Sequence, residues 1–438
     1  MAFHLHGIRL PHRKYTSQKA VVSMPPPATV TIPMSMHIGA PATPIVKVGD
    51  EVRVGTKIGE AAGKVSSPIY SSVSGKVTKI TEIQISSGAM MPAVVITSDG
   101  EMTPDESIAP PTVTSREELI EAVRANGSVG LGGAGFPTHV KLDVDPTRIE
   151  HLVINCAECE PYITSDTVTM TTRQADMATA LEALKKYLGI RSVVIGVESH
   201  NKQGVAAMMQ FMKDHAKDCT ITVKVLPSVY PQGGEKVLIY HATGRTVPMG
   251  KLPIDVGCIV LNCTTLASIG AYLQTGMPLV NKCVTVAGGA VAAPQNVIVP
   301  IGTAMSDVFE FCGGLDQEPA KVLYGGPMMG VSVPDISMPV LKNTNAILAL
   351  TEHESALPKT TACIRCGSCT NTCPFGLAPA AIALAYRAKD AAQLEALSVN
   401  ACMECGCCSY VCPANRPLVQ TNRLSKAFLR ENKAKEGK

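Results

Sequence analysis

Eight cysteines near the end of the chain constrain its fold more than any other feature. They form two runs of identical C-x2-C-x2-C-x3-C-P spacing, a pattern typical of proteins that hold two [4Fe–4S] clusters. In this pattern the first three thiolates of a run bind one cluster, and the fourth, which precedes proline, binds the other. We therefore assign Cys363, Cys366, Cys369 and Cys412 to cluster one, and Cys402, Cys405, Cys408 and Cys373 to cluster two.

Zinc is the alternative metal for so many cysteines. Zinc ribbons hold each ion with two C-x2-C pairs, whereas each run here has four cysteines and ends in Cys-Pro. Cys407 lies outside the regular spacing, and we interpret it as a bystander beside the ligand Cys408. Alanine and leucine recur at helical spacing between the runs, which predicts a helical ferredoxin-type domain that transfers single electrons.

The remaining composition disfavours several classes of protein. The other cysteines are scattered and the first residues lack the apolar core of a secretion signal, so we expect the reducing cytoplasm. A net charge of +3, no tryptophan and 4% aromatic residues disfavour nucleic-acid binding. Polar residues interrupt the longest uncharged segment, 256–281, so we expect no membrane span in this chain.

Short alternating runs and frequent turn residues between positions 20 and 100 predict a small all-β module. Its segment KVGDEVRVGTKIGEA resembles the first hairpin of the barrel-sandwich hybrid domains that carry lipoyl or biotinyl groups on a lysine. Lys64 falls near the position of that lysine, but Gly63 and Val65 flank it in place of methionines. We therefore expect a structural module without such a group.

The middle of the chain alternates strands with helices, which predicts a mostly parallel sheet with helices on its faces. Ser115 and Glu118 match a capping box that begins a helix. The predicted strands are 151–156, 192–197, 220–226 and 258–262, and the predicted helices are 173–188, 202–216 and 235–242. The patterns divide the chain into a β-module (1–110), an α/β domain (111–275), a small α+β unit (276–335) and the helical cluster domain (336–438).

The segment Gly130–Gly135 contains a G-x-G-x-x-G sequence. A helix and not a strand precedes it, so it lacks the context of a Rossmann dinucleotide loop, and alone it is equally typical of a glycine-rich turn. Glycines nevertheless let backbone N–H groups approach a phosphate, and Lys141 can supply positive charge. Asn155 and Asn262 end two strands, at the edge of the sheet where ligands usually bind in such folds.

The wider segment GLGGAGFPTHVKL (130–142) resembles the flavin loop of the NADH-binding subunit of respiratory complex I. NCAECEP (155–161), YPQGGEKVLI (230–239) and LNCTTLA (261–267) resemble further blocks of that family in the same order. The resemblance implies non-covalent FMN and NAD(H) as the substrate, with Phe136 and Glu160 facing the nucleotide. The cofactor-binding residues that it implies are Gly130, Gly132, Gly133, Gly135, Phe136, Lys141, Asn155, Glu158, Glu160, Tyr230, Gly233, Glu235, Asn262 and Thr265.

Four positions depart from the pattern of the complex I subunit. Ala157 replaces an aspartate, Gly234 and Lys236 replace a glutamate and a threonine, and Thr264 replaces a glutamate. These substitutions bear on how the nucleotide would be bound more than on how the flavin would be bound.

Nearly the whole chain resembles the C subunits of Rnf electron-transport complexes. The resemblance rests on HGIRLPHRKYT, SVSGKV, GGAGFPTHVKL, INCAECEPYITSD, YPQGGEK, VLYGGPMMG and the paired cysteine runs. It implies a multidomain α/β fold: a barrel-sandwich-like β-module, a Rossmann-like flavin domain with a mostly parallel sheet, a soluble-ligand-binding β-grasp unit and a helical two-cluster ferredoxin domain.

The same resemblance implies a peripheral subunit on the cytoplasmic side of the cell membrane. Its partners would be integral membrane subunits, which translocate Na⁺ or H⁺, and a ferredoxin-accepting iron–sulfur subunit. Nicotinamide exchanges two electrons and a cluster exchanges one, so a flavin is needed between them and no catalytic side chain is expected.

Two alternatives remain open at this point. The cobalamin reductases of propanediol-degrading microcompartments use similar blocks, but there the flavin loop precedes the β-module. The second alternative is a relay subunit without enzymatic activity, whose flavin domain has lost nucleotide binding; the residues Ala157 and Gly234 motivate it.

Overall fold

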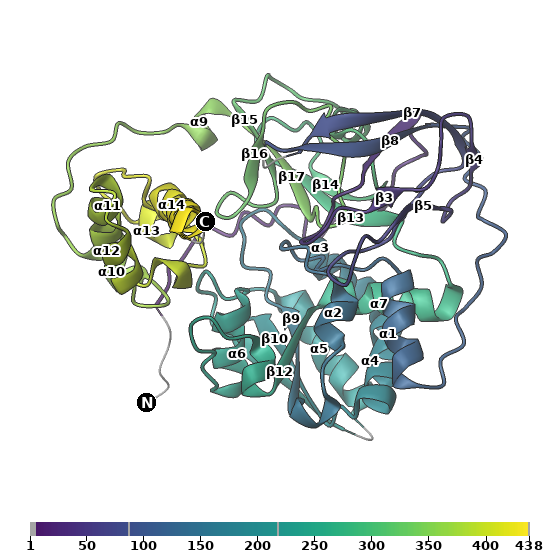
Figure 1. Cartoon of the computed structure of the whole chain (residues 1–438), viewed down its shortest axis with the longest axis horizontal. Helices are drawn as coiled ribbons and strands as arrows, with labels where there is room; N and C mark the ends of the chain where they lie inside the picture. Colours follow the sequence, from purple (N-terminus) through teal and green to yellow (C-terminus); the bar gives the residue numbers. More distant parts are fainter. Residues whose placement is uncertain (1–5, 86–87, 217–218, 437–438) are drawn as a thin grey trace.

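The computed structural model describes residues 6–85, 88–216 and 219–436. Figure 1 shows the cluster domain, with helices α10 to α14, on one side of the molecule, and an extended segment joins it to the rest. The flavin domain, with strands β9 to β12, lies below two β-rich units in the same view.

The β-module contains two small antiparallel sheets around one apolar core. One has the order β2-β8-β7-β4 and the other β3-β5-β6. Their bounds are β2 (Thr29–Pro33), β3 (Thr43–Pro44), β4 (Glu51–Val52), β5 (Lys57–Glu60), β6 (Ile69–Tyr70), β7 (Gly75–Gln84) and β8 (Met90–Ser98). Ile32, Ile58 and Ile96 are fully buried between the sheets. Lys64 is exposed and its Nζ lies 3.5 Å from an Asp143 carboxylate oxygen.

The α/β domain follows the predicted pattern. Its four strands are all parallel, in the order β11-β10-β9-β12. They are β9 (His151–Cys156), β10 (Ser192–Glu198), β11 (Thr220–Leu226) and β12 (Cys258–Asn262). The helices are α1 (Arg116–Ala125), α2 (Thr138–Leu142), α3 (Ser165–Thr172), α4 (Gln174–Leu188), α5 (Lys202–His215), α6 (Glu235–Thr243) and α7 (Cys263–Thr275). The predicted capping box at Ser115 is confirmed, because its side chain accepts a hydrogen bond from the Glu118 amide and the Glu118 side chain caps Ser115 in return.

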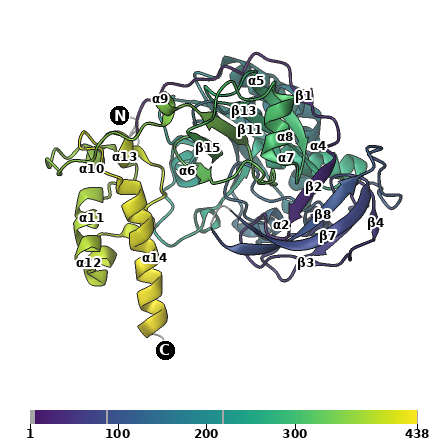
Figure 2. The ribbon, with the colours of Figure 1, turned by 90° about the horizontal axis from the view of Figure 1, so that it is seen from above.

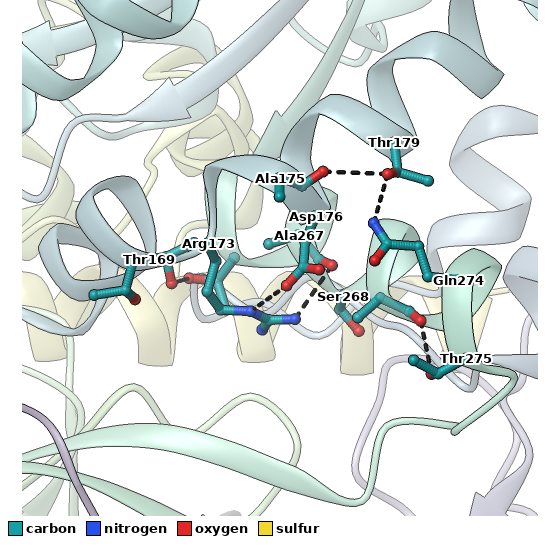
Figure 3. A network of polar contacts seen from close by, with 12 residues as sticks. Thr169, Arg173, Ala175, Asp176, Thr179, Ala267, Ser268, Gln274 and Thr275 are labelled. Atoms are coloured by element: carbon teal, nitrogen blue, oxygen red, sulfur yellow. Dashed lines mark hydrogen bonds and ion pairs between the residues drawn. The ribbon is translucent and has the colours of Figure 1, made fainter.

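Close contact between α4 and α7 fixes one face of this domain. The Arg173 guanidinium donates to Asp176 at 2.8 Å and to the Ala267 carbonyl at 3.3 Å, which ties the start of α4 to α7 (Figure 3). Gly270 permits this approach, since a Cβ at that position would overlap the Asp176 carbonyl oxygen.

The β-grasp unit is larger than the sequence predicted. Its six-stranded sheet has the order β1-β14-β13-β17-β15-β16, and residues from both sides of the predicted 276–335 range contribute to it. The strands are β1 (Val22–Ser23), β13 (Asn281–Ala287), β14 (Gln295–Pro300), β15 (Lys321–Tyr324), β16 (Val331–Val333) and β17 (Ala346–Leu350), with helix α8 (Met305–Phe311). All five residues of β17 are buried between β13 and β15, so the sheet of this unit extends beyond residue 335.

The cluster domain consists of short helices. They are α10 (Ser368–Thr372), α11 (Pro379–Arg387), α12 (Ala391–Ala396), α13 (Cys407–Tyr410) and α14 (Leu418–Glu436). The helical pattern between the cysteine runs forms two helices and not one, because the chain reverses at Lys389, which has φ +55°. Leu418 and Leu429 of α14 are buried, and Figure 2 shows α14 alongside α11 and α12.

Several smaller elements complete the fold. They are α9 (Glu352–Ser355) and the 3-10 helices Pro146–Arg148, Pro253–Val256 and Val399–Ala401. Among the helices of the described residues, none combines the length and the apolar character that a membrane span requires.

The segment 8–20, which we call the N-terminal strap, precedes the strands of the β-module and crosses the other units. Ile8 pairs with Tyr230 through backbone hydrogen bonds, and the Thr16 hydroxyl lies 2.5 Å from that of Thr164. The strap continues into β1, which joins the β-grasp sheet beside β14. The first residues of the chain therefore connect the flavin domain to the β-grasp unit.

Candidate flavin and iron–sulfur sites

A cavity of about 640 Å³ lies where the flavin domain, the β-grasp unit and the cluster domain meet. Its volume is within the range of small-ligand sites, roughly 300–1,000 Å³. We call it the flavin cavity. Most of the residues predicted to bind cofactor line it, namely Gly130, Gly132, Gly133, Lys141, Asn155, Glu158, Glu160, Tyr230, Gly233, Glu235 and Asn262.

The glycine loop forms a closed turn at one wall of the cavity. The Gly130 amide donates to the Phe136 carbonyl at 2.9 Å, and the Gly135 amide donates to the Gly130 carbonyl at 3.1 Å. Gly133 has φ +141°, and a Cβ there would project into open space. The loop therefore presents bare backbone to the cavity, which is the surface that a phosphate group needs.

Three predicted residues, Gly135, Phe136 and Thr265, do not line the cavity. Thr265 lies behind the loop, where its hydroxyl accepts from the Leu131 amide at 3.0 Å. Phe136 contributes its carbonyl to the turn of the loop. The structure therefore places these residues where they support the loop.

The two strand-end asparagines are opposite one another, since Asn155 of β9 pairs in register with Asn262 of β12. The Asn155 amide donates to the Gly233 carbonyl at 2.9 Å. The Asn262 amide donates to Asp166 at 2.7 Å, and its oxygen caps α7. A side-chain amide nitrogen carries two hydrogens, so each residue can hold the local structure and still offer a donor to a ligand.

Two acidic residues of the segment after β9 line the cavity, Glu158 buried and Glu160 half-buried. Glu158 accepts from the Asp166 amide at 2.7 Å and from the Thr167 hydroxyl at 2.8 Å. Glu160 accepts from the amides of Met328 and Met329 at 3.0 and 2.8 Å. Burial raises the pKa of each carboxyl to about 7. Glu160 is thus bound by the β-grasp unit, which approaches through Gly326, where a Cβ would overlap the carboxylate.

A lysine–glutamate pair lies at the wall formed by β12 and α6. Lys141 donates to Glu235 at 2.9 Å and to the Val260 carbonyl at 3.0 Å. Both side chains line the cavity and are partly exposed. Lys141 can therefore place a positive charge at the cavity, and the Glu235 carboxylate balances that charge.

Tyr230 connects the flavin cavity to the second cysteine run. Its side chain is 3% exposed and its hydroxyl donates to the Cys405 carbonyl at 2.8 Å. Gly234 lies against the same run, and a Cβ at that position would overlap Met403 Cε. The glycine that replaces a glutamate of the complex I pattern therefore lies against the Met403 side chain of the cluster domain.

The four cysteines predicted for cluster two surround one small cavity, because Cys373, Cys402, Cys405 and Cys408 all line it. The Glu404 amide and the Asn422 side chain each donate to Cys402 Sγ at 3.4 Å. Hydrogen bonds to sulfur are among the features that tune iron–sulfur clusters. The buried Cys407 lines the same cavity, and its Sγ lies 3.9 Å from the Tyr230 carbonyl.

The cysteines predicted for cluster one are partly gathered. Cys369 and Cys412 pack in one apolar group with Cys408, whereas Cys363 and Cys366 lie exposed on the preceding segment. Over the described ranges, no three His, Cys, Asp or Glu side chains are close enough to hold one metal ion.

The structure adds residues that the sequence patterns did not indicate. Buried Lys282 of β13 donates to the Leu131 carbonyl at 3.1 Å behind the glycine loop. Buried Lys342 donates to the carbonyls of Pro68 and Gly127 at 2.7 and 2.8 Å, and burial lowers its pKa to about 7. Further residues that line the flavin cavity from other domains are Gly325, Gly326, Asn343, Thr344, Asn345, Met403, Glu404 and Arg423. None of them was predicted to line this cavity, and only folding brings them to the site.

Fold and site together define a flavin and iron–sulfur electron-transfer protein, and four known domain families match the chain accordingly. They are the RnfC barrel sandwich hybrid domain (residues 2–101), the Nuo51 FMN-binding domain (123–271), the SLBB domain (283–332) and the 4Fe-4S dicluster domain (359–416). The matches to the FMN-binding domain and to the 4Fe-4S dicluster domain confirm the predicted cofactors, FMN and [4Fe–4S] clusters.

Curated relatives cover most of the chain. The C subunit of the Na⁺-translocating ferredoxin:NAD⁺ oxidoreductase complex of Acetobacterium woodii is 41% identical over 86% of this chain and 86% of its own length. The corresponding protein of the proton-translocating complex of Clostridium ljungdahlii is 38% identical over 85% and 81%. The C subunit of the ion-translocating oxidoreductase complex of Rhodobacter capsulatus is 39% identical over 97% and 82%.

The chain belongs to the family of C subunits of Rnf ion-translocating oxidoreductase complexes, and the predicted family is confirmed. Its fold also resembles that of a chain of an NAD⁺-reducing [NiFe]-hydrogenase, with a TM-score of 0.50 and 19% identity over 72% of this chain and 61% of the other.

Proposed function

We propose that this chain is the NAD(H)-reactive C subunit of a membrane-associated ferredoxin:NAD⁺ oxidoreductase complex. Relatives that share most of its length are named as subunits of such complexes. FMN, when bound, would exchange electrons in pairs with a nicotinamide and singly with the clusters. The residues of this chain hold, orient and shield the groups that carry out this exchange.

One observation carries the proposal: the flavin cavity and the second cysteine run share a wall. Met403 and Glu404, which lie between Cys402 and Cys405, line the same cavity as the glycine loop. Tyr230 contacts both the flavin cavity and the second cysteine run. It lines the cavity, and its hydroxyl donates a hydrogen bond to the Cys405 carbonyl. Cluster two is therefore the one that would exchange electrons with the cavity.

The cavity residues suit FMN and a nicotinamide nucleotide. Gly132 and Gly133 line a space that a phosphate can enter, and Lys141 adds positive charge. Asn155 and Asn262 would contact ring or ribityl atoms through their remaining amide hydrogens. Glu160, with the β-grasp residues around it, would lie toward the nucleotide.

The exposed side of cluster one suits contact with another protein of the complex. Cys363 and Cys366 are exposed while the ligands proposed for cluster two are more enclosed. We infer that electrons enter or leave through cluster one, from the ferredoxin-accepting iron–sulfur subunit. The chain would sit on the cytoplasmic side of the cell membrane as a peripheral subunit, and integral membrane partners would translocate Na⁺ or H⁺.

Cofactor analysis and reduction by NADH test the proposal. We expect about eight iron, eight acid-labile sulfide and one FMN per chain, from two cubanes with four thiolates each. NADH should bleach the flavin absorbance of the purified chain. If NADH leaves the flavin oxidised while dithionite still reduces the clusters, the relay alternative holds and the enzymatic proposal is wrong. A colourless or zinc-loaded chain would contradict both.

A further inference from the structure

A second, polar cavity of about 160 Å³ lies beside the N-terminal strap. Lys14 of the strap, Thr167 of α3 and the residues His200, Asn201 and Lys202 at the start of α5 line it. The electron-transfer function proposed for this chain does not use this cavity. We call it the strap cavity.

A single hydrogen bond separates the strap cavity from the flavin cavity. Glu158 lines the flavin cavity and Thr167 lines the strap cavity. The Thr167 hydroxyl donates to Glu158 Oε2 at 2.8 Å. Both residues are buried, with 7% and 5% of their surface exposed, so this contact lies inside the protein.

The neighbours of Thr167 fix the direction of its hydroxyl hydrogen. Asn201 donates its side-chain N–H to the Thr167 oxygen at 2.8 Å. A hydroxyl has one hydrogen and two acceptor lone pairs, so its hydrogen points at Glu158 and one lone pair remains for a water in the strap cavity. This is the arrangement that a two-step proton relay requires.

Charged groups from several elements face Glu158. Lys14 of the strap donates to the carbonyls of Glu158 and Glu160 at 2.7 and 2.8 Å. Burial raises the pKa of Glu158 to about 7, the Lys14 charge lowers it, and Asp166 raises it. Glu198 of β10 also faces Glu158, as do Cys263 of α7 and Cys283 of β13. Lys14 is thus the nearby cation that lets this carboxyl both hold and release a proton near neutral pH.

We propose that Thr167 and Glu158 form a proton conduit between the strap cavity and the flavin cavity. The inference rests on the proposed function. Oxidation of NADH to NAD⁺ delivers two electrons and one proton to the flavin, and full reduction of the flavin needs one further proton. Glu158 gives up that proton, takes another from the Thr167 hydroxyl, and Thr167 takes one from water in the strap cavity. When two electrons pass to the clusters, the flavin would release two protons: one returns to Glu158 and leaves by the reverse route, and the second follows it along the same route.

The conduit would matter while a nucleotide is bound, because the nucleotide would close the other path for protons, which runs through the mouth of the flavin cavity. A nicotinamide nucleotide bound beside Glu160 would occupy part of the flavin cavity and exclude water from it. A proton must then arrive from the opposite side of Glu158, where the strap cavity lies. The conduit therefore predicts that Glu158 stays in exchange with solvent while the nucleotide is bound.

Infrared spectroscopy of the full chain, loaded with FMN and clusters, tests this. The C=O band of protonated Glu158 is assigned by its absence in Glu158→Gln, and its hydrogen–deuterium exchange is followed with and without saturating NAD⁺. We expect NAD⁺ to leave the exchange rate unchanged within about twofold in the natural chain. If NAD⁺ slows it about tenfold or more, protons enter through the mouth and the proposal is wrong.

Variants of Thr167 test the hydroxyl itself. Thr167→Val keeps the shape and loses the hydroxyl, and we expect exchange in the NAD⁺ complex to slow at least about tenfold, while Thr167→Ser restores it. Thr172→Val, on the exposed side of the same helix, is the matched control and should behave as the natural chain. Equal exchange in Thr167→Val and the control overturns the conduit. If the natural chain binds no FMN or is not reduced by NADH, the proposed function has failed instead.

Discussion

Removing the Tyr230 hydroxyl should loosen the contact between the flavin domain and the second cysteine run. Tyr230→Phe deletes the group that donates to the Cys405 carbonyl at 2.8 Å. Tyr230 is 3% and Cys405 8% exposed, so solvent cannot replace the lost donor. Leaving a buried acceptor unsatisfied costs about 1–3 kcal/mol. At about 1.4 kcal/mol for each factor of ten, local opening of the run becomes roughly 5- to 140-fold more frequent.

Hydrogen exchange of the amides of α13 measures this opening. Ser409 and Tyr410 donate their amides to the Gly406 carbonyl at 3.0 Å, directly after Cys405, so they exchange when this run opens. We expect these two amides to exchange roughly 5- to 140-fold faster in Tyr230→Phe than in the natural chain, with the clusters intact. Tyr410→Phe is the control, since Tyr410 is 54% exposed. Exchange within twofold of the natural chain in both variants would refute the reasoning.

Three further predictions concern metal content, flavin affinity and pH. Cys402→Ser should lower bound iron from about eight to about four per chain, whereas Cys407→Ala should keep about eight in iron analysis; equal loss in both would refute the ligand assignment. Gly133→Ala places a side chain at φ +141°, a strain of about 1–3 kcal/mol, so fluorescence titration should show FMN binding weakened about tenfold or more; unchanged affinity would contradict the proposed cradle. Burial raises the pKa of Glu198 from 4.5 to about 8, so the folded chain holds this proton more tightly than the unfolded chain and loses stability as pH rises through that window. Glu198→Gln should therefore melt at a higher temperature than the natural chain at pH 9 but not at pH 5, and an equal difference at both pH values would show that Glu198 does not titrate in this way.

The sequence by itself determined the features that depend on short spacings. The cysteine runs specify clusters because ligand geometry is set by residues three or four positions apart. The strands 151–156, 220–226 and 258–262 were predicted with the bounds that the structure shows. For 151–156 and 258–262 the reason is that a buried parallel strand is a short apolar run bounded by polar residues. Family resemblance added FMN, which neither composition nor periodicity indicates.

Only the tertiary structure decided how the domains combine into one site. Met403 of the cluster domain, Gly326 of the β-grasp unit and Gly132 of the glycine loop are far apart in sequence and border the same cavity, and no periodicity predicts such a contact. The strap is a second example, since Lys14 reaches the carbonyls of Glu158 and Glu160 across about 145 residues of chain. Local patterns specify which element forms, whereas the packing of buried surfaces specifies which elements meet. For this reason the sequence could predict the cofactors, and the fold alone revealed the shared wall between the flavin cavity and the second cysteine run.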